Sequence, residues 1–229
     1  MKKKKKNIIG AVICTLNEEE TIGDIVKNAK KFVDEVCIVD GHSKDKTVDR
    51  AKKTGACVIF EEERGKGGAI RTAARRKNYD IFVFLDADGS HDPDDIPKLI
   101  QPIKKDWADH VIGSRLRGGS DELHGSFTEL LKLFGASFAT LCINIRFKQD
   151  LSDSQNGFRA IRGKVLKALN LTENSVAIEQ EILVKTIKNG YKTIEVPAHE
   201  YERKAGKAKV NAYRQIPRHL HTLIKYILF

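Results

Sequence analysis

Short apolar runs alternate with helical segments through the first half of this chain, and this alternation limits the folds that it can adopt. A run of Val, Ile, Leu, Phe and Cys without polar interruption is typical of a strand that is buried on both faces. Strands joined by helical crossovers pair in parallel and carry helices on both faces of the sheet. We therefore expect an α/β fold with a doubly wound, mostly parallel sheet flanked by helices. The expected strands cover residues 8–14, 36–39, 57–60, 81–85 and 110–113, and the helices cover 18–31, 45–53, 66–77 and 93–105.

The second half of the chain is less regular. Residues 114–125 are rich in glycine and charge, which predicts a mobile loop. No internal repeat or linker is apparent, so residues 1–210 are expected to form one domain. Its remaining expected elements are helices at 127–145 and 178–188 and strands at 157–161 and 191–196.

Residues 211–229 form an extension whose apolar side chains recur at helical spacing, which predicts an amphipathic helix. Such a stripe can pack on the core of the domain, or it can lie in a membrane interface beside anionic lipid. Basic side chains just before the stripe leave both options open. The apolar positions are Ile216, Leu220, Leu223, Ile224, Ile227 and Leu228.

The chain has 229 residues and a formal net charge of +10, which implies an acidic partner such as nucleic acid, an anionic membrane or a phosphorylated substrate. The four cysteines form no Cys-x-x-Cys pair, so zinc is not expected, and their apolar surroundings fit a reducing cytosol. We expect no signal peptide, and no apolar run of the sequence approaches the ~18 residues that span a bilayer. We expect a cytoplasmic protein.

One loop carries the strongest chemical signal. The apolar run 81–85 ends abruptly at Asp86-Ala87-Asp88, so a buried strand delivers two carboxylates to its carboxyl end, where open α/β sheets bind ligands. Mg²⁺ and Mn²⁺ take one or two carboxylates and complete their shell with water and phosphate oxygens. The loop therefore predicts a divalent metal that joins the protein to a phosphorylated substrate. A simple turn followed by a helix cap is the alternative, because Asp, Gly, Ser and Pro all favour turns.

Three other strand ends also carry polar residues. They are the segment 15–19 after the first strand, the segment 40–45 after the second, and the glycine-rich segment 64–68 after the third. A right-handed doubly wound sheet places these turns along one edge. We therefore expect them to meet the Asp86 and Asp88 loop in one cleft.

In these segments the sequence resembles the family 2 glycosyltransferases of the GT-A fold. Within them it is most similar to the polyprenyl (dolichyl) phosphate hexose synthases, typified by dolichyl-phosphate mannose synthase. The similarity extends over roughly residues 8 to 210, and the last segments are more particular to lipid-phosphate acceptors. The matching segments are 15–19, 39–47, 64–67, 84–93, 112–115, 153–160 and 203–209.

The resemblance implies a role for individual residues. Those implied for the donor nucleotide sugar are Thr15, Glu18, Asp40, Lys66 and Asp86, with Lys66 near the diphosphate. Asp86, Asp88 and Ser90 would hold Mg²⁺ or Mn²⁺. Asp88 and Arg115 would act at the reaction centre, and the acceptor phosphate would be held by Arg115, Arg203 and Lys209.

The implied activity is the inverting transfer of a hexose, mannose or glucose, from GDP-mannose or UDP-glucose to a polyprenyl monophosphate. The enzyme would be peripheral on the cytoplasmic face of the membrane. A phosphate acceptor is already ionised and needs no general base. Glu179 and Glu181 fall where base-using relatives carry a carboxylate, and ordinary helix acids explain them equally well.

Three other functions would also explain part of these sequence features. A family 2 glycosyltransferase could use a soluble phosphorylated or glycan acceptor. Nucleotidyl transfer to a sugar phosphate is disfavoured, because its glycine-rich phosphate loop would follow the first strand. A basic nucleic-acid-binding domain rests on the charge alone and lacks a recognition motif and interleaved aromatic residues, so no nucleic-acid partner is expected.

Overall fold

A computed structural model describes residues 7–121 and 127–204, together with Lys225. The predicted acceptor residue Lys209 lies outside these residues, and so does the expected amphipathic helix at 211–229 apart from Lys225. So do the lysines at positions 2–6, residues 122–125 of the expected loop, and residue 126.

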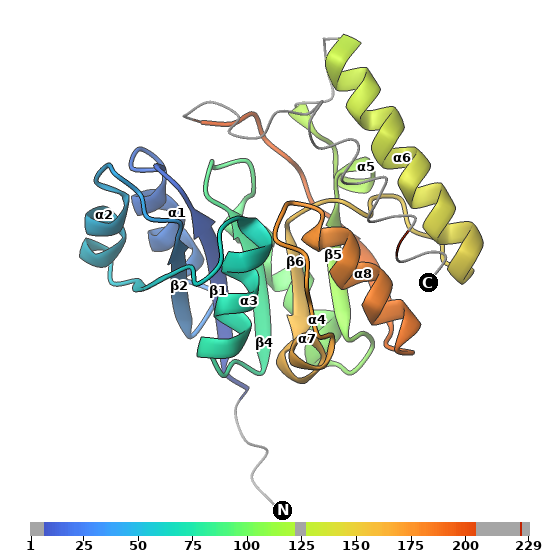
Figure 1. Cartoon of the computed structure of the whole chain (residues 1–229), viewed down its shortest axis with the longest axis horizontal. Coiled ribbons are helices and arrows are strands. Elements are labelled where there is room, and N and C mark those ends of the chain that lie inside the picture. The colour runs from blue at the N-terminus through green and yellow to red at the C-terminus, as the bar shows by residue number, and fades with distance from the viewer. Residues whose placement is uncertain (1–6, 122–126, 205–224, 226–229) are drawn as a thin grey trace, which may run out of the picture.

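The described residues build one seven-stranded sheet with the order β3-β2-β1-β4-β6-β5-β7 (Figure 1). Every pairing is parallel except the two that β6 makes with β4 and β5. The sequence prediction of a mostly parallel α/β sheet is therefore confirmed. The strands are β1 (Ile9–Thr15), β2 (Glu35–Asp40), β3 (Cys57–Phe60), β4 (Ile81–Asp86), β5 (His110–Ser114), β6 (Arg159–Arg162) and β7 (Thr193–Pro197).

Helices cover both faces of this sheet, and the strands alternate their side chains between two cores. Ile81, Val83 and Leu85 of β4 point to one core, while Phe82 and Phe84 point to the other. The first core includes α1 (Ile22–Ala29) and α4 (Ile96–Lys104), and the second includes α3 (Lys66–Arg76), α7 (Gly163–Ala168) and α8 (Ile178–Lys188). Strands buried on both sides explain why the sequence shows continuous apolar runs.

The remaining helices lie nearer the edges of the sheet. They are α2 (Thr47–Lys53), the short 3₁₀ helix η1 (Pro93–Asp95), α5 (Arg115–Gly118) and α6 (Phe127–Phe147). The long helix α6 lies on the outside of the molecule beside α8 (Figure 1). Ala139 and Ile143 on its inner side pack with Leu183 and Val184 of α8.

The outer side of α6 is apolar as well. Phe134, Phe138, Leu141 and Ile145 are 66%, 58%, 52% and 72% exposed. These four side chains, which we call the α6 stripe, recur at the three- and four-residue spacing of one helix face. Among the described residues no helix is long and apolar enough to cross a membrane.

Some local expectations were wrong. Helix α1 begins at Ile22 rather than at residue 18, because Asn17 adopts φ 51° and accepts a hydrogen bond from the Lys44 N–H at 2.8 Å. The segment expected to be a loop after β5 contains α5 in its described part. Helix α7 was not expected, and β6 runs antiparallel to its neighbours.

Candidate active site

The carboxyl ends of the central strands meet at one edge of the sheet. The last residues of β1 and β2, Thr15 and Asp40, are register partners, and Asp86 at the end of β4 pairs with Cys14. Ser114 ends β5, and Arg115 follows it directly. The structure therefore brings these predicted residues to a common edge, and their roles toward substrates stay predictions.

Asp40 organises the turn after β2. One carboxylate oxygen accepts the Ser43 N–H at 2.7 Å, and the other accepts the hydroxyl groups of Ser43 at 2.7 Å and Thr15 at 2.9 Å. Asp40 is 0% exposed. Both carboxylate oxygens of Asp40 thus bind groups of the protein itself. For Asp40 to bind a nucleoside, these hydrogen bonds would have to rearrange.

Glu18 belongs to the turn between β1 and α1. Its N–H donates to the Thr47 hydroxyl at 2.8 Å, and its carbonyl oxygen accepts the Ile22 N–H at 3.1 Å. The backbone of Glu18 thus joins the turns that follow β1 and β2. The role of Glu18 as a donor-binding group stays a prediction.

Lys66, the first residue of α3, lies between two carboxylates. Its Nζ is 2.6 Å from Asp86 Oδ1 and 2.6 Å from Glu179 Oε1. Burial alone would lower the pKa of Lys66, but attraction to Asp86 and Glu179 outweighs it and raises that pKa. Burial would likewise raise the pKa of Asp86, but Lys66 holds it well below its usual range. Lys66 and Asp86 are therefore ionised at neutral pH.

Asp88 is held by the turn that follows it and by a distant segment. Its Oδ1 accepts the Ser90 N–H at 3.0 Å and the Ser90 hydroxyl at 2.7 Å. Its Oδ2 lies 2.8 Å from Arg203 Nη2. The structure thus places Arg203, predicted to hold the acceptor phosphate, on the carboxylate predicted to hold metal.

Residues 198–204, which we call the strap, run from α5 to the Asp88 loop. The Glu200 N–H donates to the Gly119 carbonyl at 3.0 Å, and the Tyr201 N–H donates to the Ser90 carbonyl at 2.9 Å. The Lys204 N–H donates to the Asp88 carbonyl at 3.1 Å. The strap therefore joins the loop after β4 to the segment after β5.

The donor set of Asp86, Asp88 and Ser90 consists of oxygen atoms, which fits Mg²⁺ or Mn²⁺. Among the described residues no cluster of three His, Cys, Asp or Glu side chains could hold a metal ion. A hard divalent cation does not require such a cluster, since water and substrate phosphate complete its shell. A metal on Asp88 Oδ2 would take the position that Arg203 has here.

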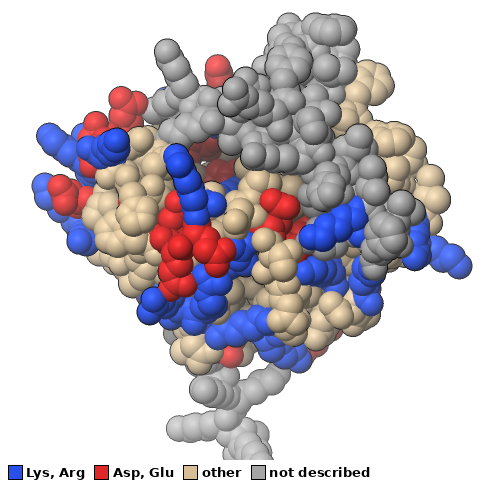
Figure 2. Space-filling view, viewed as in Figure 1, with Lys and Arg blue, Asp and Glu red and all other residues tan. Residues whose placement is uncertain are grey.

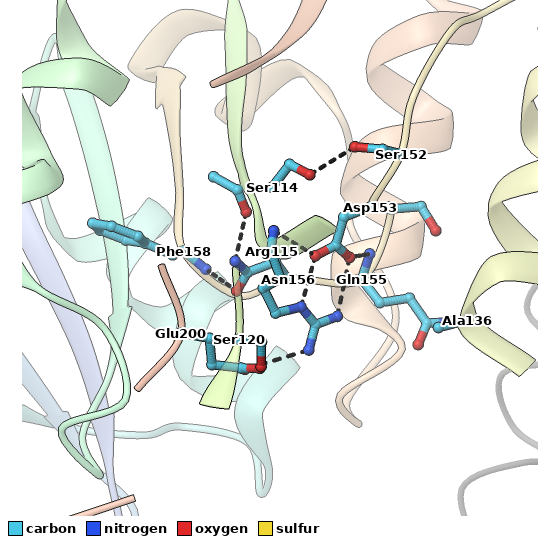
Figure 3. Close-up of polar contacts among 12 residues, drawn as sticks. Ser114, Arg115, Ser120, Ala136, Ser152, Asp153, Gln155, Asn156, Phe158 and Glu200 are labelled. Atoms are coloured by element: carbon cyan, nitrogen blue, oxygen red, sulfur yellow. Dashed lines mark hydrogen bonds and ion pairs between the residues drawn. The ribbon is translucent and has the colours of Figure 1, made fainter. Parts of the chain in front are cut away.

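Arg115 is held from two sides by carboxylates (Figure 3). Its Nε and Nη2 lie 2.6 and 3.0 Å from the two oxygens of Asp153, and its Nη1 lies 3.3 Å from Glu200 Oε1. Burial would lower the pKa of Arg115, but these two carboxylates raise it. A guanidinium has further N–H donors beyond these three. Arg115 is therefore fixed in place and can still donate to a phosphate.

Comparison with known proteins assigns the chain to a family. The model of glycosyl transferase family 2 matches residues 11–169, which is more than half of the chain. This chain belongs to glycosyl transferase family 2. It is a glycosyltransferase.

Relatives of this glycosyltransferase include enzymes named for lipid phosphates. The dolichyl-phosphate hexose transferase of Haloferax volcanii is 30% identical over 208 residues, which cover 90% of this chain and 87% of that protein. The dolichol-phosphate mannosyltransferase of Pyrococcus furiosus is 29% identical over 231 residues, which cover 95% of this chain and 64% of that protein.

A solved structure shares the fold. Glucosyl-3-phosphoglycerate synthase from Mycobacterium tuberculosis, in complex with Mn²⁺, UDP and glucosyl-3-phosphoglycerate, matches this chain with a TM-score of 0.77 and 21% identity. The match covers 97% of this chain and 81% of that one. The same enzyme has also been solved with Mg²⁺ and UDP. At this identity the likeness establishes the GT-A fold of the glycosyltransferase.

The site of the glycosyltransferase includes residues for which the sequence indicated no role. Asp153 and Asn156 lie in a segment on which the family resemblance rests, but the sequence did not indicate that they bind Arg115 and the Gly113 carbonyl. Glu200 is 85 residues from Arg115 in the sequence, and no local pattern links the two. His91 directly follows the predicted metal residue Ser90, but a polar residue in a turn is ordinary.

Proposed function

We propose that this glycosyltransferase moves a hexose from a nucleotide sugar to a polyprenyl monophosphate, with inversion at the anomeric carbon. The observation that carries the proposal is the cationic partner on three carboxylates of the site, Asp86, Asp88 and Glu179. Lys66 pairs with Asp86 and Glu179, and Arg203 pairs with Asp88. Such carboxylates are poor general bases, and an acceptor that is already ionised needs none.

The donor side would be formed by the turns after β1, β2 and β4. Thr15, Glu18 and Asp40 would surround the nucleoside, whether from GDP-mannose or UDP-glucose. Asp86, Asp88 and Ser90 would hold Mg²⁺ or Mn²⁺, which when bound offsets the charge of the departing nucleoside diphosphate. The metal-bound and UDP-bound structures with the same fold support this assignment.

The acceptor side would lie between Arg115 and the strap. Arg115 would donate to the acceptor phosphate, and Arg203 and Lys209 would join it once Arg203 leaves Asp88. An oxygen of that phosphate attacks the anomeric carbon opposite the diphosphate. The new carbon–oxygen bond forms as the bond to the diphosphate breaks, and the departing group takes the electron pair. Fixed groups on both sides hold the reactants in line.

The relatives named for dolichyl phosphate and the exposed α6 stripe support a lipid acceptor. The Thr140 hydroxyl on α6 donates a hydrogen bond to the Ser154 hydroxyl at 2.8 Å. The residue before Ser154, Asp153, binds Arg115. The stripe therefore lies about one helix diameter, roughly 10 Å, outside the segment that fixes the acceptor cation. We also propose that residues 1–210 form the catalytic domain and 211–229 an amphipathic helix, which together place the enzyme on the cytoplasmic membrane face.

The test is transfer of radiolabelled sugar from GDP-mannose and from UDP-glucose to polyprenyl phosphate in detergent, with Mg²⁺, Mn²⁺ or a chelator. We expect metal-dependent label in the lipid phase. Asp88→Asn should lower it at least about a hundredfold, which is the range for loss of one electrostatic group at a reaction centre. Asp24→Asn, on the exposed side of α1, is the matched control and should leave transfer unchanged.

The same assay with 3-phosphoglycerate and with glycan acceptors separates the alternatives. Label in a soluble phosphorylated or glycan product, with none in the lipid phase, would move the acceptor to a soluble molecule. Salt-sensitive binding of RNA or DNA without any sugar transfer would contradict the enzyme assignment for this chain.

A further inference from the structure

We propose that His91 and Asn156 are positioning residues that fix the distance between the donor-side carboxylates and the acceptor-side Arg115. This inference rests on the proposed division of the site into a donor half and an acceptor half. It concerns two buried side chains that are not among the residues predicted to bind the donor, the metal or the acceptor.

Asn156 lies where three strands come together. Strand β6 separates β4 from β5 in the sheet, and Asn156 stands just ahead of β6. Its Nδ2 donates to the Gly113 carbonyl of β5 at 2.5 Å, and its Oδ1 accepts the Phe158 N–H at 3.1 Å. Because each partner is a backbone group with a fixed polarity, the orientation of the amide is determined.

That orientation determines the tautomer of His91. Asn156 Oδ1 can only accept, so His91 Nε2, at 3.0 Å, carries the hydrogen. His91 Nδ1 is then free of hydrogen, and it accepts the Asp86 N–H at 3.1 Å. The imidazole thus joins the backbone of Asp86 at the end of β4 to Asn156, which is bound to β5.

Other contacts make this link stiff. The His91 ring stacks on Phe158, with centroids 4.9 Å apart and planes 15° from parallel. The backbone of His91 also forms a β-bridge with Glu200, and Glu200 holds Arg115. His91 and Asn156 are both buried, and Figure 3 shows Asn156 in the same cluster as Arg115 and Phe158.

The consequence is a fixed span across the reaction centre. Asp86 carries the donor side, while Gly113 is two residues before Arg115 on the acceptor side. Strand β6 lies between β4 and β5, and His91 and Asn156 connect the two strand ends across it. In-line displacement depends on this span, and a misplacement of about 1 Å costs on the order of a hundredfold in rate.

The experiment compares His91→Phe, His91→Gln and a matched control. His91→Phe keeps a ring to stack on Phe158 and removes both polar contacts, whereas His91→Gln can still donate to Asn156. The control is His110→Phe, which removes another buried histidine at the amino end of β5, on the opposite edge of the sheet. For each variant we would measure kcat, donor KM, Mn²⁺-dependent binding of the nucleoside diphosphate by calorimetry, and Tm.

His91→Phe should lower kcat about a hundredfold. Its donor KM and its affinity for the metal-bound nucleoside diphosphate should stay within about threefold of the wild type. His91→Gln should recover part of kcat, and the control should lose Tm without losing kcat. Equal kcat in His91→Phe and the control would overturn the inference. So would loss of nucleotide affinity in parallel with kcat, since His91 would then belong to the donor site.

A second readout does not depend on the acceptor. Two-bond ¹H–¹⁵N correlation spectra of the histidine rings should show hydrogen on Nε2 of His91, and the signal is assigned by its absence in His91→Gln. A ring with hydrogen on Nδ1 would overturn the inference. If the wild-type enzyme labels only a soluble acceptor, the proposed lipid acceptor fails, and the kinetic comparison is made with that soluble acceptor instead.

Discussion

Glu179 tests the claim that the enzyme works without a general base. It is buried and lies 2.6 Å from Lys66, so Glu179→Gln should keep a hydrogen-bonding group of the same shape beside the ammonium. We expect kcat to stay within about fivefold of the wild type, whereas loss of a general base costs ~10²–10⁴-fold. Steady-state transfer to polyprenyl phosphate measures this. A hundredfold loss with unchanged Tm would contradict the claim that transfer to a phosphate acceptor needs no carboxylate at this position.

Asp153 gives a prediction on stability and pH. Burial would raise its pKa, but hydrogen bonding and attraction to Arg115 hold that pKa below its usual range. A carboxyl with a lowered folded pKa stabilises the fold above its unfolded pKa of ~3.9, and this contribution disappears as pH falls through the folded value. Asp153→Asn should therefore destabilise the protein by about 1–3 kcal/mol at pH 7, because it removes one of the two carboxylates that pair with Arg115.

The pH dependence separates this effect from a simple packing defect. The difference in unfolding free energy between wild type and Asp153→Asn should shrink as pH falls below about 4. Urea unfolding at a series of pH values measures it. Asp24→Asn is the control for removing one exposed carboxylate. A difference that stays constant down to pH 2 would contradict the assigned ion pair.

At the scale of elements, the α6 stripe should touch lipid. The double variant Phe138→Glu with Ile145→Glu places two charges on the exposed apolar side of α6. We expect at least about a tenfold loss of transfer to polyprenyl phosphate in vesicles, because burial of each such side chain is worth ~1.5–3 kcal/mol. Transfer to a water-soluble, short-chain prenyl phosphate should change less than about twofold.

Trp107→Glu is the matched control for that variant, since Trp107 is an exposed apolar residue just before the amino end of β5, on the opposite edge of the sheet. An equal loss with both acceptors would place the effect in the fold of α6 and not in a lipid contact. Unchanged transfer in vesicles would show that the α6 stripe does not contact the lipid acceptor.

The sequence predicted elements best where local pattern decides them. The apolar runs of β3 and β4 and the helix α8 are found at or within one residue of the expected bounds. The position of Asp86 and Asp88 at the carboxyl end of a buried strand was predicted because the strand and its loop are adjacent in the chain. The start of α1 was wrong because the Asn17 side chain binds a backbone group 27 residues away. The contacts of Arg203 and Lys66 were missed for the same reason, since their partners come from other elements.

At the scale of the whole molecule, the net positive charge lies in the two end segments of the chain. Residues 2–6 and 205–229 carry ten Lys and Arg and no Asp or Glu, which equals the net charge of +10. Residues 7–204 are therefore neutral overall. On the face in Figure 2, described basic side chains surround acidic ones that gather near the centre. An anionic surface would thus be recognised chiefly through the two end segments, each with five basic residues.

These two segments make a matched pair for a final prediction. Replacing Lys207, Lys209, Arg214, Arg218 and Lys225 with Gln should weaken binding to vesicles of anionic phospholipid, since each basic residue near such a surface contributes about 1 kcal/mol. Replacing the five lysines at 2–6 removes the same charge without a neighbouring apolar stripe, and should weaken binding less. Binding of the wild type should fall as salt rises from about 0.05 to 0.5 M, because added salt screens the attraction. Cosedimentation measures both variants. Equal losses of vesicle binding would mean that charge alone determines binding. No loss in either variant would contradict recognition of an anionic membrane through these segments.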